Sequence, residues 1–157
     1  MKKIITCLFT MLICIGVFAQ ESKYKIGDKG PGGGFIFYAE DGEFREVSVS
    51  LNKNKYVTWY EAKKLAQNYR GGGFKDWRLP TLEELYMIYN NLNPSKEDIA
   101  KLGYHSYWSS TECDPEIPNT KGAYAIGGDH DAGGLHHCSW ADNRSNTVRV
   151  VRSFKIK

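Results

Sequence analysis

The stretch at residues 76–85, with the sequence Asp-Trp-Arg-Leu-Pro-Thr-Leu-Glu-Glu-Leu, constrains the fold more than any other part of this chain. Its Trp and first Leu alternate with charged residues, a pattern typical of a short extended segment with one buried face. Pro80 disfavours helix at the residue before it. Thr81 then predicts a helix N-cap, because Glu84 stands where a capping-box partner belongs. We therefore expect an extended segment that turns directly into a helix.

A second capping box, formed by Thr58 and Glu61, predicts another helix upstream. The triple glycine at residues 71–73 ends that helix. The helix after Thr81 ends at Asn93-Pro94, and residues 95–102 could add a short helical turn. Apolar side chains recur at helical spacing in both helices: Ala62, Leu65, Ala66 and Tyr69 in the first, and Leu82, Leu85, Met87, Ile88, Tyr89 and Leu92 in the second.

Strand patterns stand on both sides of the helices. Residues 35–38 are apolar on both faces, which predicts a central strand, and the alternation in residues 44–51 predicts its hairpin partner. Further strands are expected at residues 107–111, 123–126 and 147–154. Residues 127–146, rich in Gly, His, Asp and Asn, are expected to form a long functional loop. This order of elements predicts an α+β fold with two helices packed on small antiparallel sheets.

Residues 1–19 have the pattern of a secretory signal peptide, with Lys2 and Lys3 before an apolar run and Ala19 at the cleavage site. The run is shorter than the roughly 20 residues of a membrane span, which disfavours an uncleaved anchor. A lipoprotein is disfavoured because no small residue directly precedes Cys14. We expect a secreted or periplasmic protein whose single domain covers residues 20–157.

The net charge and the cysteine content limit the classes of binding partner and indicate a disulfide. The net charge of +3 falls when the signal peptide leaves, so nothing indicates nucleic acid or an anionic membrane as the partner. Cys113 and Cys138 then remain as an even pair in an oxidising compartment, and a disulfide between them is expected. Two thiolates bound to a metal are the alternative.

Five blocks of this sequence, taken in order, resemble the domain family typified by the C-terminal domain of the Legionella collagen-like protein, long filed as a domain of unknown function. The blocks lie at residues 32–38, 59–62, 76–85, 107–112 and 148–152. The resemblance implies a variant of the C-type lectin-like fold. It also implies a binding role, because the collagen-like adhesin binds sulfated polysaccharides through this domain. This chain departs from that adhesin in having no collagen-like repeat and in its near-neutral charge.

One candidate site in residues 127–146 is a metal centre. Asp129, His130, Asp131 and His136 supply ligand types for calcium or a transition metal, although their spacing matches no tight zinc pattern. A solvated loop is the alternative reading of the same residues. The triplets used by calcium-dependent C-type lectins are only approximated, at residues 116–119 and 140–143.

The other candidate is a glycan site without metal, which needs an aromatic platform and a few planar polar groups. Trp140, Asp142, Asn143 and Arg144 supply these groups within a short stretch. The remaining tryptophans, Trp59, Trp77 and Trp108, are expected in the core.

Catalysis has less support. The Gly-x-Ser-x-Gly elbow of serine hydrolases is missing from the sequence, and Ser109 and Ser110 are expected to be structural. The formylglycine-generating enzyme shares the broader fold and uses paired cysteines, but this chain is far shorter. We expect a binding module that recognises a glycan or another surface molecule through residues 127–146. The alternatives are a protein–protein interaction domain of the cell envelope and, third, a metal-dependent enzyme.

Overall fold

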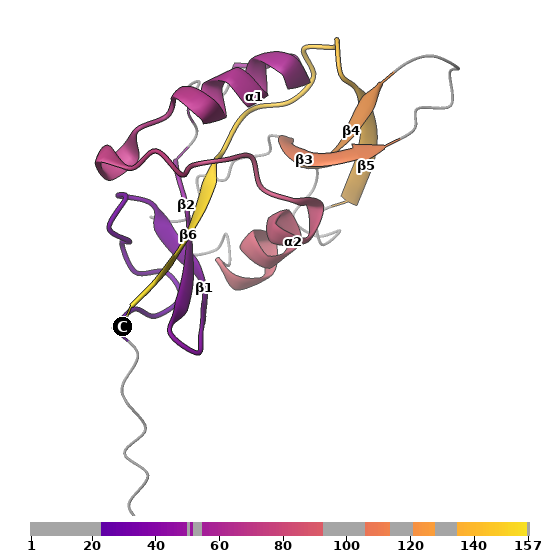
Figure 1. The fold of residues 1–157 in the computed structure, drawn as a ribbon. Helices are drawn as coiled ribbons and strands as arrows, with labels where there is room; N and C mark the ends of the chain where they lie inside the picture. Colours follow the sequence, from indigo (N-terminus) through magenta and orange to yellow (C-terminus); the bar gives the residue numbers. More distant parts are fainter. Residues whose placement is uncertain are drawn as a thin grey trace, which may run out of the picture.

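The computed structural model describes residues 23–49, 51, 55–92, 106–113, 121–127 and 135–156. These residues form two α-helices and two three-stranded antiparallel sheets (Figure 1). The predicted α+β class, with two helices and small antiparallel sheets, is confirmed. Neither described helix has the length and apolar character needed to cross a membrane.

The first sheet has the strand order β1-β2-β6, with β1 at Phe35–Glu40, β2 at Glu43–Val47 and β6 at Val151–Lys155. The prediction that residues 35–38 form a central strand was wrong, because β1 lies at the edge and β2 is central. Its adjacent residues Ile36 and Phe37, which point to opposite faces of the strand, are nevertheless both fully buried. Phe37 packs in a core with α2, and the preceding segment bonds the outer edge through Gly27 N and Ile36 O, 2.8 Å apart.

The predicted strands at residues 44–51 and 147–154 are shorter than expected. β2 ends at Val47 and β6 begins at Val151. The reason is that residues 146–150 bond to several segments in turn. Thr147 pairs with the start of β3, whereas the carbonyls of Val148 and Val150 accept from backbone N–H groups at residues 51 and 48. Val49, within the strand predicted at residues 44–51, is 54% exposed.

The second sheet has the order β3-β4-β5, with β3 at Tyr107–Cys113, β4 at Gly122–Gly127 and β5 at Leu135–Trp140. The prediction of a loop throughout residues 127–146 was therefore wrong for β5. This strand pairs with β4 along its whole length, from Gly122 opposite Trp140 to Gly127 opposite Leu135. Cross-strand hydrogen bonds thus stabilise a strand whose sequence is polar enough to look like a loop.

Both predicted capping boxes are confirmed. Helix α1 spans Trp59–Asn68 with Thr58 as its N-cap, and α2 spans Leu82–Asn91 with Thr81 as its N-cap. In each box the threonine hydroxyl accepts from the backbone N–H of the glutamate, and the glutamate carboxylate accepts from the threonine N–H. The helical turn expected at residues 95–102 lies outside the described residues.

The core consists of two apolar clusters, one beside each helix. Trp59, Trp77 and Trp108 belong to the cluster at α1 and are at most 4% exposed, which confirms their predicted place. The cluster at α2 joins the two sheets, because it contains Phe37 and Val151 from the first sheet and Ile126 from the second.

The stretch at residues 76–85 ties these parts together. Arg78 bonds both carboxylate oxygens of Glu84, at 2.6 and 2.7 Å, so the capping glutamate also holds the segment before the helix. Asp76 forms two bonds to Arg152 on β6, at 2.9 and 3.1 Å. Pro80 O accepts from the backbone N–H of Ser110, at 2.7 Å, which joins the stretch to β3.

The glycine-rich turn at residues 30–34 wraps around a buried carboxylate. Glu46 is fully buried and accepts from the backbone N–H groups of Gly32 and Gly34 at 2.9 to 3.1 Å, and from Arg152 at 2.8 Å. A Cβ atom at Gly32 would lie 2.4 Å from the ring of Trp77. The glycines therefore allow the backbone to approach Glu46 closely, and this turn has a structural purpose.

The two ends of the described chain meet at the first sheet. Tyr24 packs edge-on against Phe44 and Phe154, with ring centroids 5.5 and 5.8 Å apart. In Figure 1 this end of β6 lies at the lower left, far from β5 at the upper right.

Candidate functional site

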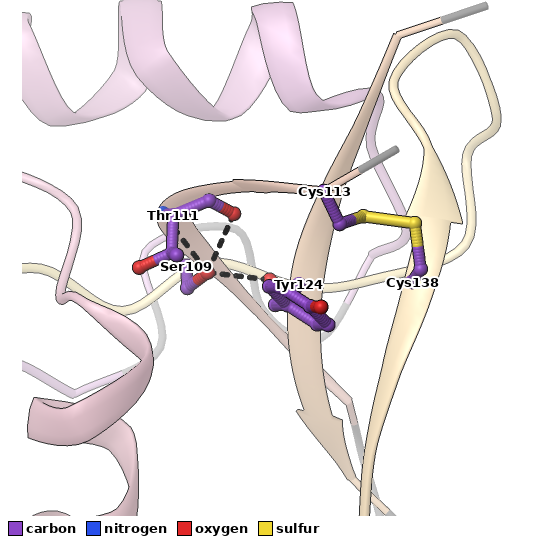
Figure 2. The surroundings of a disulfide bond; sticks show 5 residues. All are labelled: Ser109, Thr111, Cys113, Tyr124 and Cys138. Carbon is purple, nitrogen blue, oxygen red and sulfur yellow. Dashed lines mark hydrogen bonds between the residues drawn. A yellow bond between two sulfur atoms is a disulfide. The ribbon is translucent and has the colours of Figure 1, made fainter. Parts of the chain in front are cut away.

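A disulfide joins β3 to β5 across the second sheet. Cys113 and Cys138 are bonded, with Cα atoms 6.0 Å apart, so the predicted pairing is confirmed. Figure 2 shows the bond bridging the end of β3 and the middle of β5, beside Tyr124 of β4. The bridge ties β5 to β3, and its cysteine on β5, Cys138, stands two residues before Trp140.

The serines near this bridge are structural, as expected. Ser109 Oγ donates to Tyr124 O at 2.6 Å and accepts from Thr111 N at 3.1 Å (Figure 2). Ser110 Oγ donates to Pro80 O at 3.2 Å. These bonds lie where the register between β3 and β4 shifts, and they satisfy the polar groups that the irregularity would leave unpaired.

A tight turn follows β5 and is anchored on two sides. Asn143 N donates to Trp140 O at 3.0 Å, which closes the turn. Ala141, inside the turn, is buried. Its N–H donates to Lys121 O and its carbonyl accepts from Trp59 N, each at 2.9 Å. The turn is thus fixed to the start of β4 and to the first residue of α1.

A shallow hollow of about 230 Å³ lies against this turn. It is lined by Cys138, Ser139, Trp140, Asn143 and Ser145. The structure therefore brings together two of the predicted binding residues, Trp140 and Asn143. Asp142 is exposed in the turn without lining the hollow, and Arg144 is directed towards α1.

Ser139 and Ser145 line the hollow but were missed by sequence reasoning. Ser139 is adjacent to Trp140, and recognition of β5 as a strand would have drawn attention to it. The position of Ser145 depends on the path of the chain after the turn, for which the sequence holds no local signal.

Trp140 differs from the other three tryptophans in its surroundings. The indole N–H groups of Trp59, Trp77 and Trp108 donate to backbone carbonyls at 2.8 to 3.0 Å. Trp140 is 45% exposed, and its N–H has no hydrogen-bond partner among the described residues. A large aromatic face and an unused donor are therefore presented together at the hollow.

Arg144 is held by the capping glutamate of α1. Its Nη2 donates to Glu61 Oε1 at 2.8 Å, while Glu61 Oε2 accepts from Thr58 N at 2.9 Å. The bond from the Thr58 backbone, with a further contribution from Arg144, lowers the pKa of Glu61 below its usual value. The carboxylate is thus kept ionised and in place, and it neutralises the arginine beside it.

The predicted metal ligands are only partly described. Asp129, His130 and Asp131 lie outside the described residues, as do residues 116–119. His136 lies on β5, where its Nδ1 is hydrogen-bonded with the Tyr86 hydroxyl and its ring packs edge-on against Tyr124. Within the described ranges, no three His, Cys, Asp or Glu side chains gather as a metal-binding group.

Comparison with known proteins places this chain in a family. No match was found among curated proteins. A solved structure with a similar chain path is titled as that of EMS16, an antagonist of collagen receptor integrin alpha2beta1. It has 13% identity and a TM-score of 0.42, covering 76% of this chain and 96% of that one. A TM-score this low does not assign a fold by itself. The model of the Lcl C-terminal domain matches residues 39–152, most of the chain, so the chain belongs to the Lcl C-terminal domain family.

Proposed function

We propose that this protein is a secreted or envelope binding module that recognises a glycan on its partner through the surface formed by Trp140, Asp142, Asn143 and Arg144. The observation that carries the proposal is the state of Trp140. Its indole is about half exposed beside a polar hollow, and its N–H has no partner within the described part of the chain. A ligand that covers this indole would bury its apolar face and could give its N–H a partner.

The chemistry of the hollow suits a sugar. The C–H face of a sugar ring packs on an exposed indole, while its hydroxyls need nearby hydrogen-bonding groups. Asn143 and the two serines provide such groups within the same hollow. The turn is anchored to β4 and α1 by backbone hydrogen bonds, so the side chains that line the hollow are held in place before a ligand binds. Binding therefore loses little conformational entropy in the protein.

The proposed location outside the cytoplasm agrees with the disulfide. Cys113 and Cys138 form a bridge of the kind that persists in oxidising compartments. The signal-peptide pattern at residues 1–19 supports the same location.

A protein partner is the second candidate, and one observation favours it. Tyr60 and Leu65 on α1 are 40% and 36% exposed, which is high for apolar side chains on a packed helix. Together with Trp140, which directly precedes the turn bonded to this helix, they would add apolar area to a protein interface.

A glycan-array screen of the purified, oxidised protein tests the proposal, run with and without a chelator. We expect a hit that survives chelation and weakens at least about tenfold in Trp140→Ala. Ile26→Ala is the matched control, because Ile26 is 42% exposed and lines a different hollow, next to β1. A hit abolished by chelator would instead support a metal site at residues 129–136. If no glycan binds, recognition of a protein becomes the leading function.

A further inference from the structure

We infer that the hollow at Trp140 takes a single uncharged sugar residue rather than a sulfated or carboxylated one, an inference that rests on the proposed function. The first observation is the lining itself. Cys138, Ser139, Trp140, Asn143 and Ser145 are all uncharged, and Cys138 is part of the disulfide. A site for a sulfate or carboxylate group is normally built with arginine, lysine or several aligned N–H donors.

The two charged residues of the turn beside the hollow, Asp142 and Arg144, are opposite in sign. Arg144 is paired with Glu61, whose position is fixed by its hydrogen bond from Thr58. Asp142 lies in the same turn and is exposed. An anionic ligand at this turn would therefore meet the carboxylates of both Glu61 and Asp142 beside the arginine.

Hydrogen-bonding groups of both kinds face the ligand. Ser145 Oγ accepts a hydrogen bond from Nδ2 of the fully buried Asn146, at 3.0 Å. Because the serine oxygen is used as an acceptor there, its hydroxyl proton is available to donate to a ligand. The Asn143 carboxamide, which has no partner among the described residues, offers both a donor and an acceptor. Sugar hydroxyls can bond both kinds of group, whereas a sulfate group can only accept and would leave the Asn143 amide oxygen to water.

The size of the hollow indicates one ring. Its volume of about 230 Å³ lies below the range of roughly 300–1,000 Å³ found for drug-sized ligands. We therefore place one exposed sugar residue against Trp140, with the rest of the glycan extending into solvent.

The test compares neutral polysaccharides with their sulfated forms on the oxidised protein. Immobilised dextran, mannan and galactan are the neutral probes, and chemically sulfated dextran, mannan and galactan are the matched anionic probes. Binding is measured at low and high NaCl. We expect at least one neutral probe to bind more tightly than its sulfated form, with an affinity that changes less than about twofold with salt. Ser145→Ala and Trp140→Ala should each weaken it, and Ile26→Ala should not.

Failure of this inference is distinguishable from failure of the proposed function. Tighter binding of the sulfated probes, with a steep loss at high salt and dependence on both Trp140 and Arg144, would overturn the inference and leave glycan binding standing. Binding to none of the probes or array glycans would overturn the proposed function and the inference together. Circular dichroism of each variant confirms that a loss of binding is not a loss of folding.

Discussion

Replacing the buried Glu46 by Gln should destabilise the domain by about 3–5 kcal/mol, the cost of removing one partner of a buried charge pair. The glutamine keeps the shape of the side chain but turns one acceptor oxygen into a donor. That donor would then face the N–H groups of Gly32 and Gly34 and the guanidinium of Arg152. Hydrogen bonds to charged groups contribute about 1.5–3 kcal/mol each, so the loss of two of them accounts for the expected range.

Asp76→Asn is the matched control, because both carboxylates bond the same arginine. Arg152 is 5% exposed, and its two partners differ sharply, since Glu46 is fully buried and Asp76 is 51% exposed. Water screens the ion pair between Asp76 and Arg152, so Asp76→Asn should lower the free energy of unfolding by about 1 kcal/mol or less. A second control, Glu43→Gln, changes a surface ion pair on the same strand and should cost about as little.

Urea unfolding of the oxidised protein, followed by tryptophan fluorescence, measures these differences. The four proteins should show similar slopes and different midpoints, as expected when only the stability of the folded state changes. A cost below about 1 kcal/mol for Glu46→Gln would refute the reasoning, as would an equal or larger cost for Asp76→Asn.

Three further predictions follow from the same structure. Replacing both disulfide cysteines by serine should cost about 3.5 kcal/mol in the chain-entropy model for a separation of 25 residues, and an unchanged urea midpoint would contradict this. Burial raises the pKa of Glu84, but hydrogen bonds from Arg78 and the helix cap outweigh it and leave that pKa lowered. The stabilisation from ionised Glu84 is then complete above the unfolded pKa of about 4.3 and is lost as the pH falls through the folded pKa. Glu84→Gln should therefore flatten the acid side of a plot of melting temperature against pH. An acid slope as steep as that of the unmodified protein would argue against this role. Gly32→Ala should lower the melting temperature more than Gly33→Ala, because a Cβ at Gly32 would lie 2.4 Å from the buried ring of Trp77. A Cβ at Gly33 would meet no atom within 4 Å, so Gly33→Ala carries only the strain of its positive φ, about 1–2 kcal/mol. Equal melting temperatures would show that the close packing at Gly32 costs no more than this backbone strain.

Features that depend on short-range chemistry were predictable from the sequence. Both capping boxes were correct because the threonine and the glutamate that form each one are only three residues apart. The disulfide was predictable from the compartment and from the even number of cysteines. Trp77 was expected in the core because it alternates with charged neighbours, and it is 4% exposed.

Features that depend on distant partners were not predictable in the same way. β5 contains two histidines and a serine, and it becomes a strand only because β4 supplies its hydrogen bonds. The turn at residues 30–34 depends on the side chain of Glu46, which lies more than ten residues further along the chain. The candidate site was predicted in part, because Trp140 and Asn143 are close in sequence, whereas the partner of Arg144 is on α1.

The contact of Tyr24 with Phe154 has a practical consequence for how this domain can be presented to a ligand. Because the chain enters and leaves the fold at neighbouring points, a tag, stalk or host protein attached at either end projects from the same place. Figure 1 shows that place at the opposite end of the molecule from β5. A domain immobilised through its C-terminus therefore presents the Trp140 surface away from the support. The same geometry would let the domain be inserted into a larger protein without covering that surface.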